Sequence, residues 1–240
     1  MSGPGQNGTP ATVDTIARAR DRLAAVGSVA SLISHRTRNR LASLRGGLEL
    51  LQAGLERDLS QEYRDTLLKE FDELVDDLNL GLEMVRCDFD EMTAISAREI
   101  VSEAARFFAP AANRHRIDLA AACGAGPDLI RADRQLLRLT LLNLMRNASQ
   151  ALGGVAGPRI TLRTADDGDR LRIEVEDNGP GVPAEIHDRL FLGAVAGTAG
   201  AGLGLVLCRD ALTLMHGSIR YVTPKGRAGA CFRVSVPRAA

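Results

Sequence analysis

LRIEVEDNGPG, residues 171–181, alternates apolar and charged residues and then ends in a turn rich in glycine. The alternation is typical of a β-strand with one buried face, and Asp177 falls on that face with Ile173 and Val175. A buried carboxylate is costly unless a hydrogen-bond donor satisfies it. Because the glycines that follow leave room for a ligand, we expect Asp177 to accept a hydrogen bond from an N–H group, for which the amine of adenine is a good candidate.

The composition is that of a globular protein with one large domain or two small ones. Of the 240 residues 45% are hydrophobic, and 30 basic residues balance 30 acidic ones. This balance, the aromatic content of 3% and the lack of tryptophan argue against a nucleic-acid surface. No run approaches about 18 apolar residues, so we expect no membrane span. The first ten residues lack the apolar region of a secretion signal, and we predict a disordered tail over 1–13.

The cysteines lie far apart and share no metal-ligand spacing; they are Cys87, Cys123, Cys208 and Cys231. We predict that they are small buried side chains in a reduced, cytoplasmic protein.

Two long amphipathic helices are predicted over 14–86. The first covers 14–57, and the second runs from a turn at 58–60, with Ser60 as its candidate N-cap, to about Arg86. Their apolar seams comprise Leu41, Leu44, Leu48, Leu51 and Leu55, then Leu67, Phe71, Leu74, Leu78 and Val85. Because such a hairpin buries little alone, we expect two chains to form a dimeric four-helix bundle.

After a predicted linker over 87–96, the sequence changes from long amphipathic helices to a mixture of helices and strands. Helices are expected at 98–109, at 133–152 with Asp133 as N-cap, and at 203–216. Strands are expected at 117–121, 159–164, 170–177, 218–222 and 231–236. The chain is therefore predicted to be an α+β protein whose residues 97–238 form a two-layer α/β sandwich.

Asn143 and Asn147 lie four residues apart, on one face of the helix predicted over 133–152. Their amides need partners among apolar neighbours. An amide oxygen suits Mg²⁺ that also contacts phosphates, whereas the structural alternative is an amide network between packed helices. The stretch 200–205 adds glycines that open a helix, where backbone N–H groups favour a phosphate.

Three motifs in this order resemble the N, G1 and G2 boxes of the ATPase superfamily of histidine kinases, Hsp90, gyrase and MutL. They are Leu142–Ala148, Asp177–Gly181 and Gly202–Leu205, and Met215–Ile219 and Gly229–Phe232 match the histidine-kinase version. The resemblance covers roughly residues 88–238.

The resemblance implies that Asp177 binds the adenine amine of ATP, that Asn147 binds Mg²⁺ and that Asn143 lies beside the triphosphate. It implies that the site and its lid are shaped by Gly179, Gly181, Gly202, Leu203 and Gly204. Phe191 matches the first aromatic residue of the family's lid. However, no cation lies between Arg189 and the glycines of the G2 box, so one customary phosphate contact is missing or comes from elsewhere.

The predicted hairpin contains Ser34–Leu41, which resembles the phosphoacceptor box of histidine kinases. His35 is therefore the candidate nucleophile that attacks the γ-phosphate. Arg36 replaces the usual acidic base, and Arg40 replaces the usual proline. Asn39 occupies a position where the family often orients water for phosphatase activity.

The resemblance implies a soluble, dimeric histidine kinase that uses Mg-ATP to phosphorylate His35 and then an aspartate of a response regulator. No sensor domain is expected before the hairpin, so the signal would come from a separate partner protein or from a ligand on the hairpin. One alternative is a phosphotransfer or adaptor protein with a vestigial ATPase-like domain, which Arg36 and the lid favour. A serine kinase of the anti-sigma type is disfavoured by the hairpin.

Overall fold

The computed structural model describes residues 41, 42, 44–46, 49, 71, 92–192, 203–224, 226 and 228–239. The chain divides between Asp88 and Phe89 into two units, of which the second is Phe89–Ala240. The predicted tail and most of the predicted hairpin, including Ser60, lie outside the described residues.

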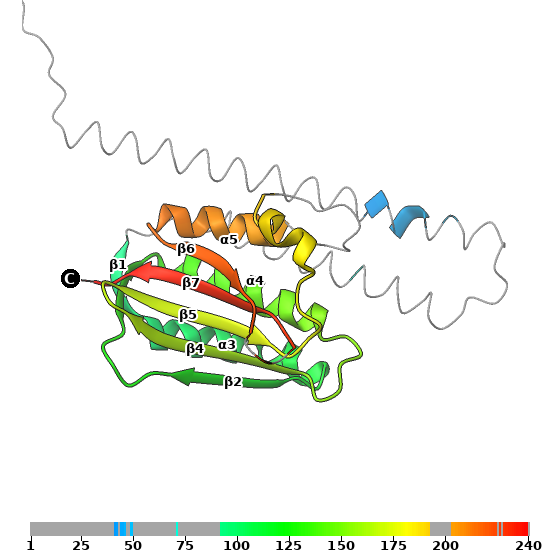
Figure 1. Cartoon of the computed structure of the whole chain (residues 1–240), viewed down its shortest axis with the longest axis horizontal. Coiled ribbons are helices and arrows are strands. Elements are labelled where there is room, and N and C mark those ends of the chain that lie inside the picture. Colours follow the sequence, from blue (N-terminus) through cyan, green and yellow to red (C-terminus); the bar gives the residue numbers. More distant parts are fainter. Residues whose placement is uncertain are drawn as a thin grey trace, which may run out of the picture. The chain divides into compact units, whose positions relative to one another are not determined.

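A five-stranded sheet forms one layer of the second unit, in the order β2-β4-β5-β7-β6 (Figure 1). The β2–β4 pair is parallel, and the other pairs are antiparallel. The strands are β2 (Asp118–Cys123), β4 (Arg159–Asp167), β5 (Arg170–Asp177), β6 (Ser218–Val222) and β7 (Cys231–Pro237).

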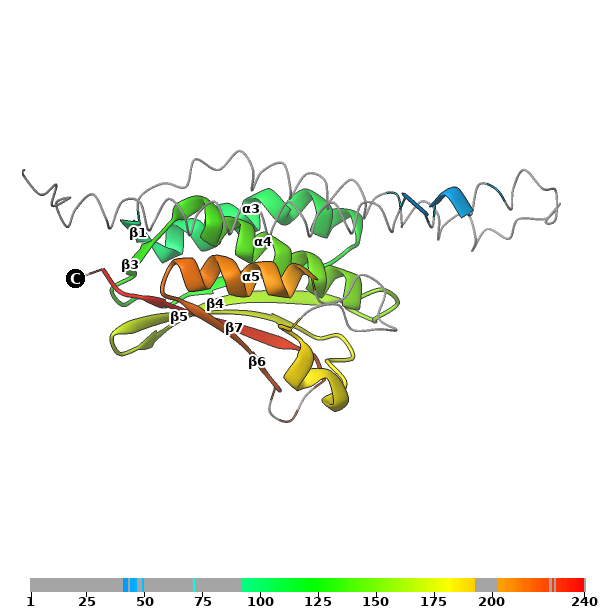
Figure 2. The same ribbon diagram turned by 90° about the horizontal axis from the view of Figure 1, so that it is seen from above.

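Three helices cover one face of this sheet (Figure 2). They are α3 (Ala97–Arg114), α4 (Arg134–Ala151) and α5 (Leu203–Leu214). The apolar core between helices and sheet includes Ile100, Leu137, Leu141, Met145, Ile160, Leu162, Ile173 and Leu212. The predicted two-layer α/β sandwich is therefore confirmed for this unit.

None of the helices within the described ranges has the length and hydrophobicity needed to span a bilayer.

Strand β5 shows the predicted alternation. Ile173 and Val175 are buried under the helices, and Asp177 ends the same buried row. On the other face Glu176 pairs with Arg163 at 2.9 Å. Because the helices of this unit cover the opposite face, the charged residues of the strand lie apart from the apolar core and pair with each other.

The predicted linker over 87–96 is wrong at its end, where Thr93–Ser96 forms strand β1. This strand pairs with β3 (Leu129–Ala132), a strand that was not predicted. Ile95 and Ile130 are paired and buried, so these short strands gain apolar contacts on folding.

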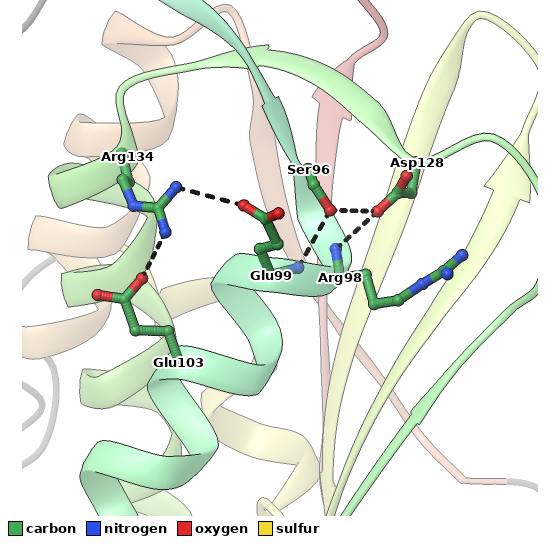
Figure 3. Close-up of polar contacts among 6 residues, drawn as sticks. All are labelled: Ser96, Arg98, Glu99, Glu103, Asp128 and Arg134. Carbon is green, nitrogen blue, oxygen red and sulfur yellow. Dashed lines mark hydrogen bonds and ion pairs between the residues drawn. The ribbon is translucent and has the colours of Figure 1, made fainter.

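Ser96 is also the N-cap of α3, because its hydroxyl accepts a hydrogen bond from the backbone N–H of Glu99 at 3.1 Å (Figure 3). The Ser96 hydroxyl donates in turn to Asp128, which also accepts from the N–H of Arg98. The Ser96 hydrogen bond is the main reason that the pKa of Asp128 is lowered. Arg134 links α4 to Glu103 of α3 at 2.9 Å. These contacts fix the entry of the chain into the second unit.

Helix α3 continues past its predicted end at residue 109 and passes through Pro110 to Arg114. Pro110 lies on the exposed side, and Ala112 beyond it is buried at 1% exposure. The added turn therefore packs its inner face on the core, which compensates for the backbone hydrogen bond that proline cannot make.

Candidate functional site

Asp177 closes β5 and is 5% exposed. Its Oδ1 accepts two backbone hydrogen bonds, from Gly179 at 2.9 Å and from Ala230 at 3.2 Å. Its Oδ2 has no hydrogen bond among the residues that the structure describes. The protein thus holds one carboxylate oxygen in place and leaves the other to accept from a ligand.

Burial raises the pKa of the Asp177 carboxyl, and the two backbone hydrogen bonds offset only part of this effect. Removal from water disfavours the ionised form. A ligand that donates an N–H to Oδ2 would stabilise the charge that the empty site disfavours. The site is therefore suited to a purine amine.

The turn after Asp177 is too crowded for side chains. A Cβ on Gly179 would lie 3.0 Å from Asp177 Oδ1 and 3.2 Å from the carbonyl oxygen of Ala151, the last residue of α4. Gly181, with φ +81°, would place a Cβ 2.8 Å from the carbonyl oxygen of Gly229. The glycines therefore bring the acid, the end of α4 and the start of the β7 region together.

Gly229 faces the tightest restriction, and we predict that Gly229→Ala destabilises the unit by about 3 kcal/mol or more. Its φ is +127°, and a Cβ there would lie 2.0 Å from the carbonyl oxygen of Asp177. Gly154→Ala is the matched control, because Gly154 has φ +80° but open space around an added Cβ, and should cost about 1 kcal/mol. Urea unfolding followed by circular dichroism measures both. Equal stability of the two variants would contradict the close approach.

The two amides of α4 have different environments. Asn143 is 4% exposed; its Nδ2 donates to Cys208 Sγ of α5 at 3.2 Å, and its Oδ1 accepts from Arg146 at 3.0 Å. This is the helix-packing arrangement that we gave as the alternative for these amides. Asn147 is half-buried, and its amide makes no hydrogen bond within the described ranges. Asn147 is therefore the better placed of the two to hold an added group.

Helix α5 begins beside Asn143. A Cβ on Gly204 would lie 2.6 Å from Asn143 Oδ1, so a side chain at this position would push α5 away from α4. Leu203 is the first residue of α5. Gly202 lies outside the described residues, as do His35 and Asn39. The structure thus brings Asp177, Gly179 and Gly181 together at one end of α4, and Asn143 and Gly204 together farther back along it.

Residues 132–240 match the family described as "Histidine kinase-, DNA gyrase B-, and HSP90-like ATPase". This region is an ATPase domain of the family that histidine kinases, DNA gyrase B and HSP90 share. The resemblance that three sequence motifs predicted is thereby confirmed.

Relatives extend the similarity beyond the ATPase domain. The signal transduction histidine-protein kinase AtoS of Escherichia coli is 30% identical over 90% of this chain, which covers 36% of AtoS. The sensory histidine kinase/phosphatase NtrB of Salmonella typhimurium is 30% identical over 81% of this chain, which covers 58% of NtrB. The chain thus spans between about a third and three fifths of these relatives.

Solved structures share the fold of the ATPase domain. The nucleotide-free catalytic domain of the histidine kinase ThkA is 26% identical, with a TM-score of 0.55, and the match covers 62% of this chain and 97% of that one. Full-length ShkA in complex with AMPPNP is 25% identical, with a TM-score of 0.56, and covers 88% of this chain and 46% of that one.

The segment that the resemblance predicts to be the lid begins after the 3-10 helix η1 (Ala184–Arg189). Phe191 packs edge-on against Phe232, with ring centroids 6.4 Å apart, and its carbonyl oxygen accepts from Arg209 at 2.5 Å. Residues 193–202 lie outside the described residues. Phe191 is therefore packed against the domain at the start of the predicted lid segment.

The histidines of the second unit lie in different environments. His187 is half-buried: its Nε2 lies 2.9 Å from the carbonyl oxygen of Val182, and its ring packs on Tyr221. His115 is exposed, and His216 follows the end of α5. Cys208 and Cys231 are buried, whereas Cys123 is half-buried and Cys87 lies outside the described residues.

Two contributors to the site were not predicted from the sequence. Gly229 allows the backbone before β7 to pass close to the backbone of Asp177, and the N–H of Ala230 donates to Oδ1 of Asp177. Both residues fall in a stretch that we matched to the histidine-kinase pattern without giving either a role. A glycine directly before a strand was the available signal for a close backbone approach.

Proposed function

We propose that this protein is an ATP-dependent histidine kinase of a two-component system. In this proposal a ring nitrogen of His35 attacks the γ-phosphorus of ATP, the bond to the β-phosphate oxygen breaks, and ADP leaves. The phosphoryl group then passes to an aspartate of a response regulator receiver domain. The observation that carries the proposal is the buried Asp177, with one oxygen fixed by backbone N–H groups and the other open to a donor.

Distances along α4 indicate how the nucleotide would lie, with adenine at one end of the helix and the phosphates farther back along it. Gly179 lies close to Ala151, the last residue of α4, so adenine would bind at the C-terminal end of this helix. Asn147 is one helical turn back, about 6 Å, and Asn143 is two turns back, about 12 Å. Asn143 in turn lies against Gly204 at the start of α5. The phosphates would therefore extend from adenine towards the glycines of the lid.

Asn147 is our proposed protein ligand for Mg²⁺. Its amide oxygen is a suitable hard ligand, and Mg²⁺ commonly combines one or two protein oxygens with substrate phosphates and water. Within the described ranges, no three His, Cys, Asp or Glu residues gather to form an independent metal site. Bound Mg²⁺ would neutralise charge on the phosphates, while Asn147 would fix its position.

The relatives support the same chemistry. ShkA binds AMPPNP, and NtrB is named as both kinase and phosphatase. We extend nucleotide binding to this chain and propose Asn39 as the residue that orients water for phosphatase activity.

Leu41 and Phe71, which we assigned to the bundle seam, are 52% and 54% exposed in the single chain. This exposure fits a homodimer in which a second copy covers residues of the hairpin over 14–86.

The domain limits are also part of the proposal. They are a tail over 1–13, the phosphoacceptor hairpin over 14–86 and an ATP-binding domain over 97–238, in a cytoplasmic protein. The strand β1 shortens the proposed linker to residues 87–92.

Incubation with ATP labelled at the γ-phosphate tests the function. We expect the label to be lost from the protein in acid and retained in base, because a phosphorus–nitrogen bond is acid-labile. Label that survives acid but not base would indicate a phosphoester and contradict the assignment. Absence of label from a protein that binds Mg-ATP would favour the phosphotransfer or adaptor alternative, which Arg36 and the cation-poor lid motivate.

A further inference from the structure

The ATPase domain lacks a cation in the segment expected to close over the phosphates. Residues 190–208 contain neither lysine nor arginine. Arg209, the next arginine, donates to the carbonyl oxygen of Phe191 and to the carboxylate of Asp210. The terminal phosphates of a nucleotide keep negative charge even beside a divalent ion. A positive group from another element would therefore be needed.

Arg146 on α4 lies near the start of α5, where we expect the phosphates of the nucleotide. Its guanidinium donates to Asn143 Oδ1 at 3.0 Å. The same oxygen would lie 2.6 Å from a Cβ on Gly204. A single amide oxygen thus connects the guanidinium to the first turn of α5, where backbone N–H groups already favour an anion.

A second observation also places the charge of Arg146 near this junction. Burial raises the pKa of the Cys208 thiol to about 12, and the positive charge of Arg146 acts against that rise. Cys208 is one turn along α5 from Gly204, and it accepts the hydrogen bond from Asn143 Nδ2. The guanidinium is therefore close enough to α5 to act electrostatically on its first turns.

We propose that Arg146 binds the terminal phosphates of the nucleotide and replaces the lysine or arginine that the lid lacks. This inference rests on the proposed function, because it assigns a residue within the same nucleotide site. A guanidinium presents several N–H donors in one plane and matches two phosphate oxygens. Asn143 acts as its positioning residue, since its Oδ1 holds the guanidinium beside Gly204.

Calorimetry on the full chain with Mg²⁺ tests this role, using AMPPNP, ADP and adenosine as probes. We expect Arg146→Gln to weaken AMPPNP binding by about 10- to 100-fold, which is the loss of a charged hydrogen bond. The affinity for ADP should fall less, and the affinity for adenosine should stay unchanged. Arg138→Gln is the matched control on α4, because Arg138 lies over the Phe107 ring of α3 at 5.7 Å, and it should bind all three probes normally.

The three probes separate phosphate binding from a structural role. Equal loss for AMPPNP and adenosine in Arg146→Gln would show that Arg146 only supports packing and would overturn the proposal, as would wild-type affinity for all three. Should the glutamine variant fail to fold, Arg146→Lys keeps the charge and the aliphatic stem but loses the planar fork. The affinity of this lysine variant for AMPPNP should then fall by about three- to tenfold, and its affinity for adenosine should not change. If the wild-type chain binds none of the probes, the nucleotide site itself is wrong.

Discussion

Asp177→Asn is expected to weaken AMPPNP binding by at least about 100-fold while leaving the fold intact. The asparagine carbonyl oxygen can still accept from the N–H groups of Gly179 and Ala230. Its NH₂ group would then replace Oδ2 and direct a donor at the donor of the adenine amine. Calorimetry measures the affinity, and circular dichroism confirms that the variant is folded. Wild-type affinity in a folded variant would remove Asp177 from the site.

The same variant removes a pH effect. Because burial raises the pKa of Asp177 above the ordinary 3.8, its proton stabilises the fold below that value, and this contribution is lost as the pH rises through the raised pKa. Nucleotide binding needs the ionised form and should weaken as the pH falls through the same range. Asp177→Asn should show neither dependence, and at pH 7 it should be at least as stable as the wild type without nucleotide.

His35→Ala is expected to abolish labelling from γ-labelled ATP while AMPPNP affinity remains that of the wild type. The imidazole is the proposed nucleophile, and alanine provides no atom that can accept the phosphoryl group. Labelling on a gel and calorimetry give the two readouts.

His115→Ala is the control for this experiment, since His115 is an exposed histidine at the end of α3. It should label fully. Undiminished labelling of His35→Ala, or its loss in His115→Ala, would assign the phosphoacceptor to another residue.

The elements with strong local patterns were predictable from the sequence. The bounds of β5 and β6 agree with the structure, because an alternating row between turns specifies a half-buried strand locally. Asp133 caps α4 as predicted, through hydrogen bonds from the N–H groups of Gln135 and Leu136. The burial of Asp177 followed from counting alternate positions along β5.

Features that depend on distant partners were missed. Each of β1 and β3 has four residues, too few for a periodic signal, and their pairing joins segments about 35 residues apart. Likewise, the spacing of Asn143 and Asn147 gave no means of telling their roles apart. Their difference comes from Cys208 and Gly204 on α5, which contact Asn143.

The fixed orientation of the Asp177 carboxylate also limits which nucleotide the proposed kinase could use as its phosphoryl donor. Guanine carries a carbonyl oxygen where adenine carries its amine, so GTP would bring one acceptor against another with no proton between them. Backbone N–H groups hold the carboxylate, so it cannot turn away to relieve the repulsion. Signalling through this domain would therefore follow the supply of adenine nucleotides and remain insensitive to changes in the guanine nucleotide pool.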